Sequence, residues 1–234
     1  MLCGIIIFHK NIFEIYNPIW INKCLDSIFS QTFQNFSILE LNYGSDDTSI
    51  ILNNHNKPYH YWNIPMKNHV YAMNFLLDKA FNELNYDIIF NINLDDYYDP
   101  TRFEKQIPYI VDKNYDIVSS DFKLIEEGND IVQQLQVGKK YYNNDLIKMM
   151  LLRKQNIIAH PCVAYSKNFW LKMKQYSVND IPVEDMKLWQ SALKQGLQFK
   201  IIPEFLLYHR LHGSQITAGK RTPKKILRKG IIVV

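Results

Sequence analysis

Three aspartates crowd the exit of an apolar run near the middle of the chain. Residues 88–92 are typical of a buried strand, and Asp95, Asp96 and Asp99 follow closely. One or two carboxylates suffice to anchor Mg²⁺ or Mn²⁺ on a nucleoside diphosphate, because phosphate oxygens and water complete the octahedron. The same residues also fit a solvated turn in which Asp99 caps a helix that begins at Pro100. The sequence therefore indicates either a cation site or a polar turn at this strand end.

A second acidic pair, Glu184 and Asp185, opens a segment with helical spacing that ends at Gly196. A carboxylate across a pocket from a cation could accept a proton from an attacking hydroxyl, and positioned bases contribute roughly 10²- to 10⁴-fold. The pair also fits a structural role, because negative charge is favourable at a helix N-terminus. Taken alone, neither Asp95 and Asp96 nor Glu184 and Asp185 distinguish a catalytic role from a structural one.

The first half of the chain alternates short strands with helices. Strands are expected at 3–8, 36–42, 59–62, 88–92 and 115–120, and one intervening helix has an inner face at Val70, Met73, Asn74, Leu77 and Phe81. This alternation predicts an α/β fold with a mostly parallel central sheet and helices on both faces. Ligands bind such sheets at the carboxyl ends of the strands, where the turn at 43–47 and the aspartates after residue 92 would meet.

The second half is less regular. Residues 121–157 contain an acidic, glycine-bearing loop and a helix near 145–154, and a helix is expected again at 183–196. No internal repeat and no Pro- or Ser-rich linker divides the chain, so we expect one domain.

Charge and cysteine content narrow the class of protein. The chain has 234 residues and a formal net charge of +4, and six of its 27 Lys and Arg residues lie in the short segment 220–229. The remainder is close to neutral, which excludes the broad basic face of a nucleic-acid binder. The segment 218–234 is expected to be a solvated basic tail or a peripheral contact with anionic lipid. Three cysteines without a CxxC pair, no signal peptide and no run long enough to span a bilayer predict a cytoplasmic protein.

Common cofactor motifs are missing. The first strand leads into Phe8-His9-Lys10-Asn11 without the glycine-rich turn of a dehydrogenase, and no HExxH or structural zinc spacing occurs.

Taken together, these segments closely resemble the family 2 glycosyltransferases of GT-A fold. The resemblance rests on motifs in the family's order and spacing over about residues 3–217: GIIIFHKN (4–11), LDSIFSQTF (25–33), NYGSDD (42–47), NLDDYYDPTRF (93–103), HPCV (160–163), EDMKLW (184–189) and YHRLH (208–212).

The resemblance implies an enzyme that transfers a hexosyl or N-acetylhexosaminyl group from a nucleotide-sugar, with a UDP-sugar favoured, to a carbohydrate or other hydroxyl acceptor. It implies inversion by direct displacement and a divalent cofactor, Mn²⁺ or Mg²⁺. The domain would span 1–217, with 1–120 binding the nucleotide-sugar and 121–217 the acceptor.

The resemblance also implies roles for particular residues. Asp185 would be the general base, with Glu184 its neighbour and substitute. Asp96 would bind the metal directly, Asp95 would contact ribose or the metal's shell, and His212 would approach the metal or the diphosphate. The donor would be held by Phe8, His9, Asn11, Asn42, Gly44, Ser45, Asn74, Asp95 and Arg210.

Departures from the family pattern cluster in the nucleotide pocket. The family's paired Asp before Gly-Ser is Asn42-Tyr43, its first-loop Thr is His9, and the Arg of its ARN triplet is Met73. These changes leave open a degenerate member that binds nucleotide or sugar without turnover. A nucleotidyltransferase on a similar sheet is a third interpretation, although its usual glycine-rich entry loop is absent.

Overall fold

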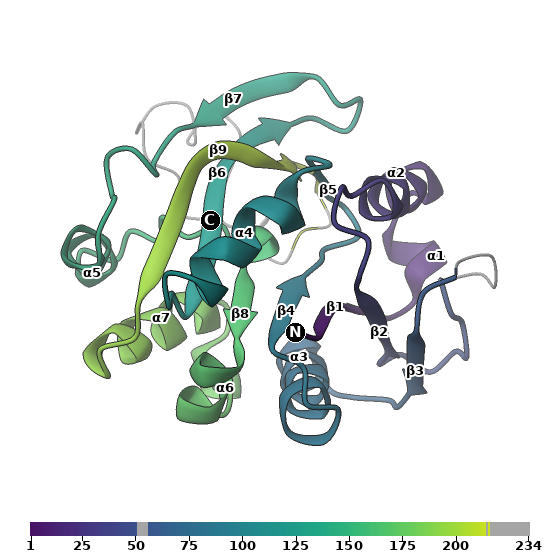
Figure 1. The fold of residues 1–234 in the computed structure, drawn as a ribbon. Helices are drawn as coiled ribbons and strands as arrows, with labels where there is room; N and C mark the ends of the chain where they lie inside the picture. The colour runs from purple at the N-terminus through teal and green to yellow at the C-terminus, as the bar shows by residue number, and fades with distance from the viewer. Residues whose placement is uncertain (51–55, 214, 216–234) are drawn as a thin grey trace.

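The chain folds around one twisted sheet that helices cover on both faces (Figure 1). The structure, a computed structural model, describes residues 1–50, 56–213 and 215. The expected α/β class is confirmed. The basic tail predicted at 218–234 lies outside the described residues.

Within the described residues, nine strands form the sheet, in the spatial order β3-β2-β1-β4-β8-β6-β9-β5, and β7 pairs with β6. The strands are β1 (Cys3–His9), β2 (Ser37–Asn42), β3 (Tyr59–Asn63), β4 (Ile88–Asn91), β5 (Tyr97–Tyr98), β6 (Ile117–Ile125), β7 (Ile131–Leu135), β8 (Ala164–Ser166) and β9 (Phe199–Arg210).

Pairing is parallel in the first half of the chain and mixed in the second. Strands β1 to β4 pair in parallel, as the sequence predicts. Strand β8 runs antiparallel to both β4 and β6, and β7 folds back on β6 as an antiparallel neighbour. The sheet is therefore parallel up to β4 and mixed beyond it, where β9 pairs in parallel with β6, and β7 follows β6 through a short hairpin connection.

Two hydrophobic clusters flank the sheet. In β1, Ile5 and Ile7 pack on the face covered by α2 and α4, whereas Ile6 packs on the face covered by α3, α5, α6 and α7. The helices are α1 (Ile12–Ile15), α2 (Pro18–Phe29), α3 (His69–Asp78), α4 (Arg102–Val111), α5 (Asn144–Leu152), α6 (Lys167–Met173) and α7 (Glu184–Lys194), with a π-helical turn at Lys79–Glu83 and 3₁₀ turns at His160–Cys162 and Val178–Asp180.

Local sequence explains where the helices begin. Asn17 accepts a hydrogen bond from the Ile19 amide (2.9 Å) and Pro18 occupies the first helical position, so α2 starts there. The helix expected from Pro100 starts at Arg102 instead. Asp99 closes a tight turn before it by accepting from the Thr101 amide (2.9 Å).

Strand direction brings several polar segments to one edge. Since β8 is antiparallel to both β4 and β6, these two run in the same direction, and β9 is parallel to β6. The carboxyl ends of β1, β2, β4 and β9 therefore open on the same side. The aspartates after β4 and the histidines at the end of β9 meet there.

We expect Trp189 to be the main anchor of α7. It is fully buried, and its ring centroid lies 5.8 to 6.0 Å from those of Phe169, Phe199 and Tyr176. Trp189→Ala should lower the free energy of unfolding by about 3–5 kcal/mol, measured in urea. Leu152→Ala, at an exposed site on α5, should change it by less than about 0.5 kcal/mol. Similar losses in the two variants would contradict this assignment.

Candidate active site

A cleft of about 520 Å³ opens at the carboxyl edge of the sheet. Five of the residues predicted from sequence line it: Phe8, Asp95, Glu184, Asp185 and His212. Asp95 and the pair Glu184 and Asp185, which lie 89 positions apart in the sequence (184 against 95), thus contribute to one space. This convergence is what the sequence predicts for ligand binding at strand ends.

Asp96 is turned away from the cleft. Its carboxylate is 1% exposed, lies 3.0 Å from Nδ1 of His209 and accepts a hydrogen bond from the Arg210 amide (2.8 Å). Burial raises the pKa of Asp96, and the neighbouring His209 and the Arg210 amide oppose this shift. In this arrangement the Asp96 oxygens hold the end of β9, and the assignment of Asp96 as a direct metal ligand stays a prediction.

Asp95 and His212 face the cleft together. Oδ2 of Asp95 lies 3.0 Å from Nε2 of His212, and Nδ1 of His212 is buried without a hydrogen-bond partner among the described residues. The two atoms are hydrogen-bonded to each other here, and as ligands of one octahedral ion at right angles they would lie a similar distance, about 3 Å, apart. No group of three or more His, Cys, Asp or Glu side chains in the described part of the chain could hold a metal alone. Phosphate oxygens and water would have to complete the shell.

Arg210 is a structural clamp in this arrangement. Its buried guanidinium donates to the backbone oxygens of Asp95 (2.9 Å), Glu126 (3.0 Å) and Glu127 (2.9 Å), and to Asn129 Oδ1 (2.8 Å). It also lies 5.0 Å from the ring centroid of Trp20. Arg210 therefore positions the Asp95 turn, and its side chain is not among those that line the cleft.

The predicted donor-binding residues of the first loops are mostly internal. His9 is buried, with Nε2 2.8 Å from Glu40 Oε1, and Asn42 accepts from the Gly44 amide (2.8 Å). An added Cβ at Gly44 would lie 2.9 Å from Asp46 Oδ1 and 3.1 Å from Asn42 Oδ1, so a side chain here would displace these polar groups. These side chains shape the loop wall behind the cleft.

The remaining three predicted donor contacts lie outside the cleft lining. Asn11 precedes α1 in a left-handed conformation (φ 46°) and donates to Glu14 (2.8 Å), and Ser45 is exposed. Asn74 exchanges two hydrogen bonds with the Tyr176 backbone, at 2.9 and 2.7 Å. Its amide therefore joins α3 to the loop before α7.

Asp185 lines the cleft beside Glu184. Its carboxylate accepts hydrogen bonds from Asn156 Nδ2 (2.7 Å) and from the Met186 amide (2.6 Å) at the start of α7. Burial, joined by the nearby charge of Glu184, nevertheless raises the pKa of Asp185 to about 7. A carboxyl poised at this value can accept a proton near neutral pH.

Glu184 is held in a different state. Burial favours its protonated form, but a 2.7 Å hydrogen bond with His69 Nε2 and the electrostatic effect of the same ring lower the pKa of Glu184 overall. Burial lowers the pKa of His160 to about 4, so this imidazole is neutral at pH 7. Neighbouring carboxyls with pKa values driven apart are a usual sign of divided roles.

Sequence reasoning missed part of the cleft wall. Lys10, Tyr16, Tyr43, His69 and His160 all line it. His69 gave no motif signal, because its partner Glu184 lies 115 positions away and only the tertiary fold joins them. Tyr43 was visible only as a departure from the family pattern.

Comparison with known proteins fits this geometry. Residues 6–171 match the family model for glycosyl transferase family 2. The chain belongs to that family. The O-antigen biosynthesis glycosyltransferase WbnJ of Escherichia coli is 28% identical over 200 residues, which are 82% of this chain and 75% of that protein. The amylovoran biosynthesis glycosyltransferase AmsE of Erwinia amylovora is 27% identical over 155 residues, 63% of this chain and 55% of that protein.

Solved structures confirm the fold. S. aureus TarS 1–349 in complex with UDP-GlcNAc superposes with a TM-score of 0.69 at 15% identity, covering 95% of this chain. The chain spans 62% of the length of that protein. The GT-A type fold and the glycosyltransferase class predicted from sequence are thus confirmed. No helix in the described ranges 1–50 and 56–213 is long and apolar enough to cross a membrane.

The raised pKa of Asp185 predicts a pH-dependent cost to stability. The folded value of about 7 lies above the unfolded value of about 4, so the folded state holds an extra proton between these pH values. Protonated Asp185 therefore favours the folded state, and this contribution to the free energy of unfolding is lost as the pH rises from about 4 to above 7. In urea titrations, Asp185→Asn should gain stability over wild type across this window, by about 2–4 kcal/mol at pH 8.

Asp145→Asn, which removes an exposed carboxylate from α5, controls for the change in net charge. A constant difference between Asp185→Asn and wild type from pH 4 to 8 would show that Asp185 titrates at its ordinary value.

Proposed function

We propose that this protein transfers a sugar from a nucleoside-diphosphate sugar to a hydroxyl group of an acceptor, with inversion at the anomeric carbon. The observation that carries the proposal is the position of Asp185, a carboxyl with a pKa near 7 in the same cleft as Asp95 and His212. One base facing a charged donor site is the arrangement that direct displacement requires.

The proposed reaction is a direct displacement that forms no covalent bond between sugar and protein. Asp185 accepts the proton of the acceptor hydroxyl as its oxygen bonds to the anomeric carbon. The bond from that carbon to the diphosphate breaks on the opposite side, and the nucleoside diphosphate leaves with the electron pair. Asn156 and the Met186 amide hold the carboxylate in place while it changes charge.

A UDP-sugar is the favoured donor. TarS, which shares the fold, has been solved with UDP and with UDP-GlcNAc. In this chain Phe8 and Tyr43 line the cleft with their ring centroids 6.4 Å apart, and the Lys10 amine lies 5.7 Å from the Tyr43 centroid. Tyr43 could stack on a base while Lys10 meets phosphate charge.

Asp95 and His212 would hold a divalent cation, Mn²⁺ or Mg²⁺, whose charge would offset that of the diphosphate.

The favoured acceptor is a saccharide hydroxyl. Two of the relatives are named for O-antigen and amylovoran biosynthesis, and this supports a saccharide as the acceptor class. A cytoplasmic location with peripheral membrane contact through the basic tail remains a prediction.

A non-catalytic binder is the second candidate, because the Asn42 side chain is engaged within its own loop, where it accepts from the Gly44 amide. Turnover decides between the two. With UDP-GlcNAc and related donors, Asp185→Asn should reduce kcat by at least about 10²-fold and leave UDP binding unchanged.

The wild-type rate should rise with pH and level off above about 7, since only the ionised form of Asp185 can accept a proton. Nucleotide binding without release of nucleoside diphosphate from any donor, including slow hydrolysis, would favour the binder. A rate that does not change between pH 5.5 and 8 would contradict the role of Asp185.

Metal binding can be assigned by a matched pair of variants. UDP with Mn²⁺ should raise the Tm of wild type, and Asp95→Asn should lose this rise without a change in the Tm of the free protein. Asp96→Asn should instead lower the Tm of the free protein, because it weakens a buried charge-assisted contact worth about 1–3 kcal/mol. A Mn²⁺ effect that survives Asp95→Asn but not Asp96→Asn would restore the assignment made from sequence.

A further inference from the structure

The two most exposed large apolar side chains lie close together in the sequence, in α1 and at the start of α2. Among the described residues, Phe13 and Ile19 are each 68% exposed, more than any other large apolar side chain. Pro18, next to Ile19, is exposed as well. We call Phe13, Pro18 and Ile19 the apolar tip. Contiguous apolar groups on a protein surface often mark a contact with another protein or with a membrane.

A belt of lysine and tyrosine side chains borders the apolar tip. Lys23 follows Ile19 by about one turn of α2, so the two lie on the same outer face. The Lys23 amine lies 4.1 Å from the ring centroid of Tyr97 in β5, and the Tyr97 ring stacks on that of Tyr208 at 4.4 Å. The Lys123 amine lies 5.0 Å from the Tyr208 centroid. The belt, Lys23, Tyr97, Tyr208 and Lys123, is partly exposed throughout, and α1, α2 and β5 share one corner of the molecule (Figure 1).

This composition fits the surface of a lipid bilayer. Apolar side chains at the tip can enter the acyl-chain boundary, while Tyr and Lys side chains place an apolar body at that boundary and a polar end among the headgroups. Lysine is depleted from protein–protein interfaces. The two lysines of the belt therefore favour lipid headgroups over a protein partner.

The sequence beyond the described residues adds positive charge next to α2. The His212 ring lies 4.9 Å from that of Trp20 in α2, and Gln215, the last described residue, accepts a hydrogen bond from the His212 amide (3.4 Å). Only five positions separate Gln215 from Lys220, a span of at most about 18 Å. Six Lys and Arg residues occupy 220–229. Their charge therefore joins the chain beside the apolar tip and complements an anionic headgroup layer.

Carboxylates near the same corner set a condition on the contact. The exposed ones are Glu14, Asp26, Glu126 and Glu127, the last two in the turn whose backbone oxygens accept from Arg210. They offset the lysines of the belt, so the described surface by itself has no excess of positive charge. Attraction to anionic lipid must come from the segment 220–229, and penetration must come from the apolar tip. Stable attachment to a bilayer commonly requires two such signals together.

We propose that the apolar tip and the belt form a membrane-docking surface, which binds bilayers that contain anionic lipid. Ile15 and Tyr16, which lie between Phe13 and Pro18 in the sequence, line the main cleft. Docking through the apolar tip would therefore hold that cleft close to the bilayer surface. The inference stands apart from the proposed function, because binding to a membrane needs no donor, metal or turnover.

Vesicle flotation with the full chain tests the proposal. The probes are vesicles of phosphatidylcholine alone and vesicles of phosphatidylcholine mixed with phosphatidylglycerol. The wild-type protein should bind the mixed vesicles, and should bind phosphatidylcholine alone at least about tenfold more weakly, because the basic segment is attracted only to anionic lipid. Phe13→Ser combined with Ile19→Ser should weaken binding to the mixed vesicles by about tenfold or more, since both changes remove apolar surface that would enter the bilayer.

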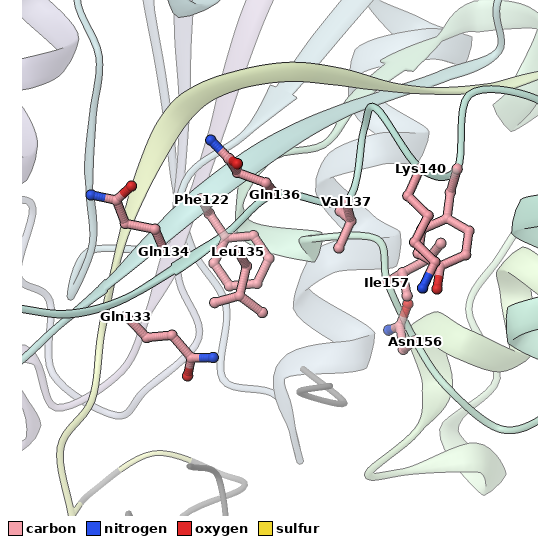
Figure 2. A pocket seen from close by; sticks show the side chains of 10 residues that line it. Phe122, Gln133, Gln134, Leu135, Gln136, Val137, Lys140, Asn156 and Ile157 are labelled. Atoms are coloured by element: carbon pink, nitrogen blue, oxygen red, sulfur yellow. The ribbon is translucent and has the colours of Figure 1, made fainter. Parts of the chain in front are cut away.

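Matched variants control for each change. Leu152→Ser combined with Leu171→Ser removes two exposed apolar side chains from α5 and α6, and should leave vesicle binding unchanged. Lys23→Gln should weaken binding about two- to fivefold. Lys140→Gln should not, although the Lys140 amine makes a similar contact, 5.2 Å from the Tyr141 centroid, because Lys140 lies beside a separate cavity of about 330 Å³ next to β7 (Figure 2).

Three results would overturn the proposal: no binding to the mixed vesicles, no preference for anionic lipid, or equal weakening by the variant of the apolar tip and its control. Light scattering on the same samples tests the other occupant. If the change at the apolar tip dissociates a dimer and leaves vesicle binding intact, the surface is a protein interface and the membrane assignment is wrong. Because the substituted side chains are exposed, the variants should keep the wild-type Tm.

Discussion

The buried contact between Asp96 and the end of β9 organises the candidate site. Asp96 holds His209 and the Arg210 amide, and the Arg210 side chain returns to the backbone of Asp95. The guanidinium also ties down the turn after β6 through Glu126 and Glu127. A charge buried to 1% exposure is tolerable only because each oxygen has a partner. Its consequence is geometric: Asp95 and His212 are left facing the cleft.

The opposite wall of the cleft, at the start of α7, depends on how Glu184 and His69 affect the pKa of Asp185. At the start of α7, Glu184 is kept ionised by His69, and this charge adds to burial in raising the pKa of Asp185. A ring cluster around Trp189 fixes the helix that carries both carboxylates. The raised pKa of Asp185 thus lowers stability at neutral pH, and such perturbed groups are common at functional sites.

The sequence predicted the elements better than their contacts. Alternating apolar residues located β1 to β4 and the start of α7 within one or two residues, because periodicity and helix-start chemistry are local. Strand β7 was not anticipated, because residues 131–135 are largely exposed and only pairing with β6 makes them a strand. Strand β9 (Phe199–Arg210) is one long strand in which Pro203 is accommodated.

At the site, residue types were easier to predict than orientation. The motifs correctly predicted that Asp95, Asp185 and His212 lie near one another. They could not show which of Asp95 and Asp96 faces the cleft. That choice depends on Arg210 and His209, more than 110 positions away. The same holds for His9 and Asn42, which the motifs predicted to contact the donor. In the structure the His9 ring is hydrogen-bonded to Glu40, and the Asn42 side chain accepts from the Gly44 amide.

The central claim is that the fold raises the pKa of the Asp185 carboxyl to about 7. The most direct measurement is a ¹³C NMR titration of aspartate-labelled protein, with the Asp185→Asn spectrum used to assign the Asp185 resonance. The account predicts a midpoint near pH 7 for this carboxyl. A midpoint near the ordinary value of about 4 would contradict it, since Asp185 would then be ionised throughout the physiological range and too weak a base for the proposed step.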